Sequence, residues 1–218
     1  MSAPAWERSL EVHTAAQTHA LAAALGAVLE TGDLLVLTGE LGAGKTTFTQ
    51  GLGEGLGVRA GIISPTFVLV RIHPNLPGGP RPGGPDLVHV DAYRLESAAE
   101  IDDIDLENTM DSAVTVVEWG RGRVEHLSDS RLEVELHRTR GGAAASAETP
   151  ETPAETGAGP VLDFDTDDDD EPRTVVIRGF GPRWAEAPAL PGVEPLPGTT
   201  PGVEPLPGTT PQTPERNP

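Results

Sequence analysis

The chain has 218 residues, enough to bury one substantial hydrophobic core, so we expect a single domain with appended segments. It contains no cysteine, which excludes disulfides and thiolate metal sites and is typical of a reducing compartment. The sequence has no secretory leader pattern and no apolar stretch long enough to cross a bilayer, so we expect a cytoplasmic protein without a membrane partner.

The net charge of −19 is unevenly distributed along the chain. Residues 140–172 contribute nearly half of it, with 1 basic and 10 acidic side chains. No segment gathers the Lys and Arg side chains that would neutralise several phosphates of a nucleic acid. We therefore do not expect the chain to bind DNA or RNA directly.

Helix and strand patterns alternate from residue 14 to residue 118. Thr14 and Gln17 have the spacing of a capping box, which predicts the start of the first helix. The expected elements, in chain order, are a helix over 14–31, a buried strand over 33–37, a loop over 39–46, a helix over 46–56, a strand over 67–72, a loop over 73–86, a strand over 87–91, a helix within 97–110 and a strand over 113–118. This alternation predicts an α/β sandwich with parallel core strands flanked by helices.

The rest of the chain has a different pattern. Residues 131–137 and 173–178 alternate apolar and charged side chains, which predicts two half-exposed, antiparallel strands that complete a mixed sheet. Between them, a stretch of about 140–172 is rich in Ala, Glu, Thr and Pro and is expected to be a disordered insertion. We expect 1–184 to form the domain and 185–218, which contains a Pro-rich ten-residue unit twice, to form a dispensable tail.

The strongest motif is the segment from Gly39 to Thr46, GELGAGKT, which matches the phosphate-binding pattern G-x-x-x-x-G-K-[ST]. Its glycines let backbone N–H groups turn towards phosphate oxygens at a helix N-terminus. In such loops the lysine, here Lys45, contacts the β- and γ-phosphates, and the following hydroxyl binds Mg²⁺. We therefore predict a P-loop NTPase. Because Lys45 is the only lysine, the Asn-Lys-x-Asp motif that reads guanine is absent, and ATP is favoured.

Three further residues are candidates for the same site. Asp91 and Glu118 end apolar strands, and the carboxyl ends of strands face the nucleotide in open α/β sheets. Either carboxylate could therefore hold the magnesium ion, and the sequence leaves the choice open. Thr66, in the segment SPTF over 64–67, lies before a predicted strand, where switch segments sense the γ-phosphate.

Four segments, in this order and spacing, resemble the bacterial TsaE (YjeE) family: GELGAGKTT over 39–47, SPTF over 64–67, HVDAYRL over 89–95 and VEW over 117–119. The resemblance covers about residues 10–138, with 173–180 as a last strand. It implies a P-loop ATPase that supports formation of threonylcarbamoyladenosine at position 37 of tRNAs reading ANN codons. It also implies a TsaB–TsaD pair as partner, with tRNA contacted only indirectly.

The resemblance assigns phosphate and Mg²⁺ binding to Lys45 and Thr46, metal binding to Glu118 and support of hydrolysis to Asp91. It places Thr66 in the first switch-like segment. The residues that it implies for nucleotide binding are Glu40, Leu41, Gly42, Ala43, Gly44, Lys45, Thr46, Thr47 and Trp119.

The sequence leaves alternatives open for the function, for the role of Trp119 and for the partner-docking surface. A P-loop kinase would need a basic lid, but the one long loop, over 74–85, contains a single arginine, Arg81. A nucleotide-dependent interaction module with slow hydrolysis fits the same residues. Packing explains Trp119 as well as nucleotide contact does. Gly120 and the acidic region over 102–105 depart from the family pattern, which leaves the partner-docking surface open.

Overall fold

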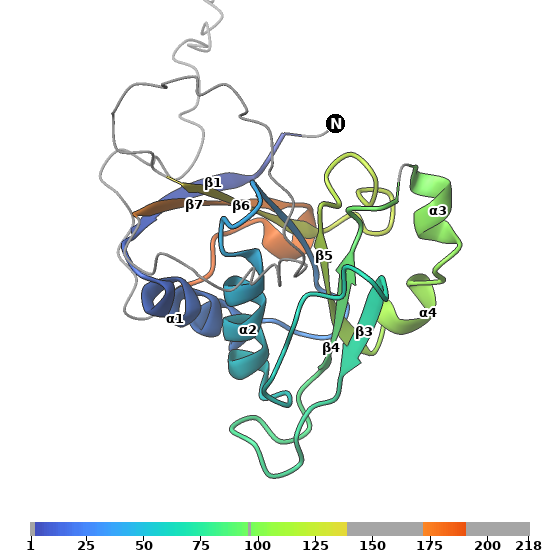
Figure 1. The fold of residues 1–218 in the computed structure, drawn as a ribbon, viewed down its shortest axis with the longest axis horizontal. Helices are drawn as coiled ribbons and strands as arrows, with labels where there is room; N and C mark the ends of the chain where they lie inside the picture. Colours follow the sequence, from blue (N-terminus) through green and yellow to red (C-terminus); the bar gives the residue numbers. More distant parts are fainter. Residues whose placement is uncertain (1–2, 96, 139–171, 191–218) are drawn as a thin grey trace, which may run out of the picture.

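A mixed β-sheet is the centre of the computed structural model, which describes residues 3–95, 97–138 and 172–190 (Figure 1). Within these residues the order across the sheet is β1-β7-β6-β2-β5-β4-β3. The strands are β1 Trp6–Val12, β2 Leu34–Gly39, β3 Val70–His73, β4 Asp86–Asp91, β5 Ala113–Glu118, β6 Arg131–Arg138 and β7 Arg173–Phe180. The helices are α1 Ala15–Gly26, α2 Lys45–Leu56, α3 Ala98–Asp102, α4 Glu107–Met110 and the 3-10 turn η1 Pro182–Trp184.

The centre of the sheet is parallel and its edges are antiparallel, which confirms the predicted fold class. β2 is parallel to both of its neighbours, β5 and β6, and β4 is parallel to β5. β7 runs antiparallel between β6 and β1, and β3 is antiparallel to β4. In this register Leu37 and Asp91 both lie opposite Glu118. The carboxyl ends of β2, β4 and β5 therefore lie side by side at the same end of the sheet.

Helices cover both faces of the sheet. Figure 1 shows α1 and α2 on one face and α3 and α4 on the other. Along β2, Leu35 and Leu37 belong to the hydrophobic core that contains α1 and α2, whereas Leu34 and Val36 belong to the core that contains α3 and α4. All four side chains are fully buried, as expected for a central strand with both faces covered.

The helices α1 and α2 pack closely because α2 is rich in glycine. A Cβ atom at Gly51 would overlap the His19 carbonyl oxygen, and one at Gly55 would overlap the Ala23 carbonyl oxygen. Glycine weakens an isolated helix by about 1 kcal/mol relative to alanine. Here it lets two helix backbones approach each other, so the cost is offset by close packing over the sheet.

Two expected elements differ from the structure in their bounds. The strand predicted over 67–72 begins only at Val70, because the N–H groups of Val68 and Leu69 both donate to the Pro65 carbonyl oxygen (2.8 and 2.7 Å) and close a turn. The helix predicted within 97–110 is divided into α3 and α4, and Asp105 between them has a left-handed backbone (φ 55°).

The outer strands differ more from the prediction. β1 was not predicted, although Trp6, Leu10 and Val12 are buried on one face of it. β6 and β7 are mostly buried rather than half-exposed, and β6 is parallel to β2 as well as antiparallel to β7. The reason is position: β6 lies inside the sheet, and Arg131 forms an ion pair with Glu133 (2.9 Å) that compensates their burial.

The predicted insertion and tail lie largely outside the described residues. The described chain continues past the predicted domain end at 184, however, and Leu190 is buried in the core with α1 and α2. The Pro188 carbonyl oxygen also accepts a hydrogen bond from Arg8 Nη1 (2.7 Å). Packing against the core therefore continues past the predicted boundary to Leu190. No helix in the described part of the chain is long and apolar enough to cross a membrane.

Candidate functional site

The loop that joins β2 to α2 has the backbone shape that phosphate binding requires. Gly42 and Gly44 have positive φ angles of 75° and 94°, a conformation that glycine adopts without strain. Gly44 is the residue before the first turn of α2. The first-turn N–H groups, those of Lys45, Thr46 and Thr47, have no acceptor within the helix and carry the positive end of its dipole. The loop and the helix start thus present N–H groups in an arrangement that suits an anion.

Lys45 lies within this loop and is almost fully buried, with 6% of its surface exposed. Its Nζ donates hydrogen bonds to the carbonyl oxygens of Gly39 and Glu40, each at 3.0 Å, and lies 4.0 Å from the centre of the Trp119 ring. Burial lowers the pKa of the Lys45 ammonium, and the carboxylates of Glu118 and Asp91 oppose that shift. The structure therefore brings the loop cation close to both predicted carboxylates.

Glu118 ends β5 and is 3% exposed. Its Oε1 lies 2.8 Å from Nε2 of His89, a fully buried residue of the neighbouring strand β4. Because a carboxylate only accepts hydrogen bonds, this contact assigns the proton to Nε2 of His89. The His89 N–H thus fixes the orientation of the Glu118 carboxylate.

Asp91 ends β4 and joins it to the segment before β3. Its Oδ2 accepts hydrogen bonds from the hydroxyls of Thr66 (2.5 Å) and Ser64 (3.1 Å), and its Oδ1 accepts one from the Tyr93 N–H (2.9 Å). The predicted switch segment is thus tied directly to a carboxylate at the edge of the sheet. If Thr66 moves, it must either break its hydrogen bond to Asp91 or move the Asp91 side chain with it.

Trp119 has an unusual backbone. Its φ of 61° is left-handed, which costs about 1–3 kcal/mol for a bulky residue and is most often retained at functional sites. The N–H of Trp119 donates to the Leu37 carbonyl oxygen (3.0 Å), and the ring contacts the Tyr93 ring edge-on at 5.5 Å. This conformation places the ring beside Lys45 rather than in either hydrophobic core.

Most of the predicted site residues therefore converge at one end of the sheet. Lys45, Asp91, Glu118 and Trp119 lie together, and Thr66 is attached through Asp91. Among the other predicted contacts, Ala43 is buried, Gly44, Thr46 and Thr47 are half-buried, and Glu40, Leu41 and Gly42 are exposed.

The donor set suits Mg²⁺. The described residues contain no group of three or more His, Asp or Glu side chains placed to hold a metal. Mg²⁺ bound with nucleotide needs no such cage, because phosphate oxygens and waters complete its shell around one or two protein oxygens. A hydroxyl from Thr46 and a carboxylate from Glu118 would be sufficient.

Sequence reasoning missed His89 and two arginines. His89 and Asp91 are two residues apart on β4 and so lie on the same face of the sheet, which is a weak signal for a common role. Arg138 and Arg173, at the outer ends of β6 and β7, lie beside the loop glycines. No local motif marks them, because the pairing of β6 with β7 brings them there.

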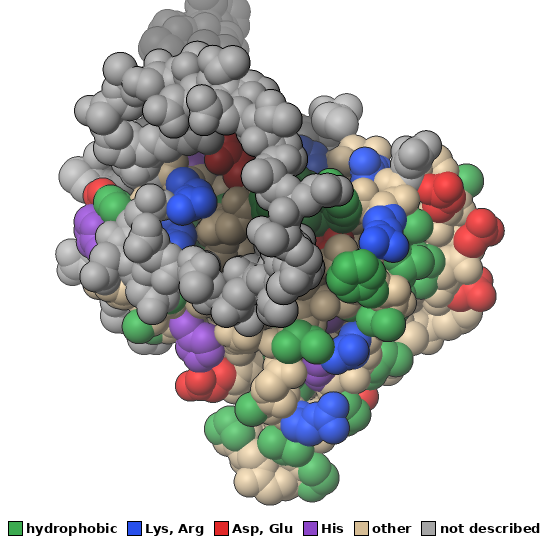
Figure 2. All heavy atoms as spheres, viewed as in Figure 1, with side chains coloured by type: hydrophobic (Ala, Val, Ile, Leu, Met, Phe, Trp, Pro, Cys, Tyr) green, Lys and Arg blue, Asp and Glu red, His purple; other side chains and the backbone are tan. Residues whose placement is uncertain are grey.

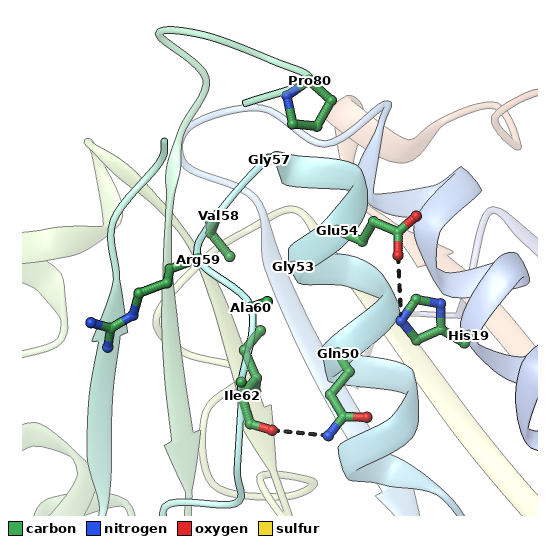
Figure 3. Close-up of a pocket in the computed structure, with 11 residues that line it drawn as sticks. His19, Gln50, Gly53, Glu54, Gly57, Val58, Arg59, Ala60, Ile62 and Pro80 are labelled. Carbon is green, nitrogen blue, oxygen red and sulfur yellow. Dashed lines mark hydrogen bonds and ion pairs between the residues drawn. The ribbon is translucent and has the colours of Figure 1, made fainter. Parts of the chain in front are cut away.

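A separate cleft of about 320 Å³ lies at the opposite, carboxyl-terminal end of α2. Figure 3 shows Gln50 of α2 donating to the Ile62 carbonyl oxygen (2.9 Å) and His19 next to Glu54, 3.7 Å away. Gly57, which ends α2, lines the same cleft. The cleft lies at the far end of α2 from the glycine loop, so it is separate from the predicted phosphate-binding residues. The hydrogen bond from Gln50 to Ile62 attaches the segment that leads from α2 to Ser64 to the helix.

Similarity to known proteins points to one family. The model of the family described as Threonylcarbamoyl adenosine biosynthesis protein TsaE matches residues 12–145. A Streptomyces coelicolor protein named tRNA threonylcarbamoyladenosine biosynthesis protein TsaE is 45% identical over 164 residues, which cover 75% of this chain and 90% of that protein. A Bacillus subtilis protein of the same name is 38% identical over 123 residues, 56% of this chain and 72% of that protein. The crystal structure of YdiB from Bacillus subtilis superposes with a TM-score of 0.54 at 26% identity, covering 82% of this chain and 88% of that chain.

Proposed function

The chain belongs to the TsaE family, and we propose that it is the ATP-hydrolysing component of the machinery that forms N6-threonylcarbamoyladenosine at position 37 of tRNAs reading ANN codons. The names of its relatives indicate a role in this biosynthesis. Our proposal is more specific in three respects: ATP and Mg²⁺ are the ligands, a TsaB–TsaD-type complex in the cytoplasm is the partner, and tRNA is contacted only through that partner.

One observation carries the proposal. The single lysine of the chain lies inside a glycine loop at a helix N-terminus, next to two strand-end carboxylates, Asp91 and Glu118. A buried ammonium held by two carbonyl oxygens of its own loop is ready to exchange them for phosphate oxygens, because hydrogen bonds between charged partners are about twice as strong.

The residues divide the work as follows. Lys45 and the first-turn N–H groups of α2 hold the phosphate chain, and Thr46 and Glu118 hold Mg²⁺, which when bound neutralises charge on the phosphates. His89 orients Glu118 through its Nε2–H. Asp91 positions the attacking water and, through Thr66 and Ser64, links the state of the γ-phosphate to the segment before β3.

Exposed hydrophobic side chains support a role with a protein partner. Leu41, Phe67 and Tyr93, all on segments that build the site, are 77%, 85% and 63% exposed. Figure 2 shows hydrophobic side chains interspersed with basic ones on the face that carries β3, while acidic side chains gather over α3 and α4. Large apolar side chains around a nucleotide site are typical of a surface that a partner covers.

The test reconstitutes the reaction with the purified chain, a TsaB–TsaD pair and unmodified tRNA. We expect slow ATP turnover alone, faster turnover with the pair, and threonylcarbamoyladenosine in the tRNA by mass spectrometry. Lys45→Ala is the matched control and should yield neither. Turnover that depends on a small acceptor, without modified tRNA, would favour the kinase. Depletion of the protein in its host with an unchanged level of the modified nucleoside would overturn the proposal.

A further inference from the structure

We infer that Arg173 is a second cationic contact for the phosphate chain of the nucleotide, on the side of the loop formed by β6 and β7. The inference rests on the proposed nucleotide site and adds to it a residue that lies over a hundred positions away in the chain. Asp91 and Glu118 approach the loop from β4 and β5, whereas Arg173 approaches it from the other half of the sheet.

The geometry places Arg173 against the loop itself. β6 runs beside the loop, since Leu136 is the register partner of Gly39. A Cβ atom at Gly44 would lie 3.8 Å from Nε and 3.9 Å from Cδ of Arg173, and one at Gly42 would lie 3.4 Å from Nη1 of Arg138. The side chains of Arg173 and Arg138 therefore lie beside Gly44 and Gly42, the two loop glycines with left-handed backbones.

Arg173 lacks a partner for a buried donor. The residue is 2% exposed, and its Nε has no hydrogen-bond partner in the structure of the described chain. Leaving a buried donor of a charged group unsatisfied costs several kcal/mol at most sites, which is why such groups are normally paired. An arginine held in this state at the mouth of an anion site is explained if the anion is its partner.

The register of β6 and β7 points in the same direction. Arg138 and Arg173 are direct cross-strand partners, so their side chains project from the same face of the sheet. Arg138 makes other contacts. Arg173 is therefore the one of the two whose buried donor a phosphate at the start of α2 would satisfy.

A purely structural role is the competing explanation, in which the aliphatic part of Arg173 packs against the loop and the guanidinium has no ligand. The two explanations differ in what the loss of the charge should do. A structural arginine stabilises the nucleotide-free protein and has little effect on ligand affinity. A phosphate contact lowers ligand affinity when it is lost, and its removal takes an unsatisfied buried donor out of the nucleotide-free protein.

The experiment uses the full chain with Arg173→Met, which keeps the aliphatic part of the side chain, and Arg173→Lys, which keeps the charge. Arg178→Met is the matched control, because Arg178 lies on the same strand but pairs with Glu7 and Glu135 on the opposite face. Calorimetry measures the affinity for ATP and for inorganic tripolyphosphate. Thermal midpoints are measured without ligand.

We expect Arg173→Met to bind both ligands about tenfold or more weakly, in line with the loss of a hydrogen bond between charged groups. We expect an unchanged or higher midpoint without ligand, Arg173→Lys to bind with intermediate affinity, and Arg178→Met to bind as the wild type does. Wild-type tripolyphosphate affinity in Arg173→Met overturns the inference. So does an equal loss of affinity in Arg173→Met and Arg173→Lys together with a lowered midpoint in both, because a lysine that keeps the charge should preserve part of the affinity if the charge is what binds. A wild-type chain that does not bind ATP overturns the proposed function as well.

Discussion

The two halves of the sheet use charged side chains in different ways. In the half formed by β2, β5 and β4, Lys45, Asp91 and Glu118 are nearly buried and gather at one edge. In the half formed by β6, β7 and β1, Arg178 bonds to Glu7 (2.6 Å) and to Glu135 (2.8 Å) on a partly exposed face of the sheet.

The difference shows how satisfied and unsatisfied charges can be distinguished. Glu135 is bonded by two arginines, Arg121 and Arg178, so this network is complete without a ligand. In the first half, Lys45 donates to two carbonyl oxygens of its own loop and lies over the Trp119 ring, and burial lowers its pKa while the nearby carboxylates of Glu118 and Asp91 oppose that shift. A complete network stabilises the fold, whereas an incompletely paired charge is available to bind.

The largest expected effect comes from Lys45. Lys45→Ala removes the only ammonium that can face the phosphate chain, and we expect ATP affinity by calorimetry to fall by about a hundredfold or more. Lys45→Arg should restore only part of it, because a planar guanidinium does not replace a compact ammonium in a tight loop. Wild-type affinity in Lys45→Ala would remove the contrast between the two halves of the sheet.

The next effect concerns the packing that supports the half of the sheet with the site. Gly55→Ala would drive a methyl group into the Ala23 carbonyl oxygen, so α1 and α2 must move apart. We expect a loss of about 2 kcal/mol, or a midpoint lower by about 4–8 °C, despite the better helix propensity of alanine. Gly78→Ala is the control, since a Cβ there meets no atom within 4 Å. Equal midpoints for the two variants would contradict the close packing.

The sequence predicted the parts of the site that local chemistry defines. The glycine loop, Lys45, and the strand-end positions of Asp91 and Glu118 follow from a motif and from alternation, and the structure brings them together. Which carboxylate binds Mg²⁺ stays a prediction, although the anchoring of Asp91 by Ser64 and Thr66 leaves Glu118 as the better candidate.

The sequence did not predict what depends on pairing between distant segments. β1 was missed because one isolated alternating strand at a chain terminus resembles an irregular segment, and it forms here by pairing with β7. Leu190 was assigned to a tail on composition, yet it packs into the core. The place of Arg173 depends on the β6–β7 register, which no short motif encodes.

A smaller effect is expected at His89, a buried residue of β4 that contacts Glu118, the proposed metal ligand. His89→Leu should raise the Mg²⁺ concentration needed for half-maximal ATP binding by about tenfold, because Glu118 loses the donor that orients it. His89→Gln retains an N–H donor and should restore most of the affinity. ATP binding without Mg²⁺ is the control and should not change. Normal Mg²⁺ dependence in His89→Leu would assign the pair to stability alone.

The boundary of the domain gives a further test in the other half of the sheet. A chain that ends at Leu190 should unfold as the full chain does, whereas a chain that ends at Trp184 loses the Leu190 side chain from the core and the bond from Arg8 to Pro188. Burial of one leucine predicts a difference of about 1–2 kcal/mol between the two truncations in urea unfolding. ATP affinity should be the same for both. Equal stability would return the boundary to the position predicted from sequence.

The smallest effect is expected for the charged network of the outer strands. Hydrogen bonds from Arg121 and then Arg178 lower the pKa of Glu135 from 4.5 to about 2. Because the pKa is lower in the folded protein, the contribution is complete above about pH 4.5 and is lost as the pH falls towards about 2. Glu135→Gln should therefore cost about 1 kcal/mol at pH 7, a value reduced by solvent screening, and much less at pH 2.5. Urea unfolding of both proteins at the two pH values measures this, and ATP affinity at pH 7 should be unchanged. A loss of affinity in Glu135→Gln would mean that the network around Glu135 also shapes the nucleotide site.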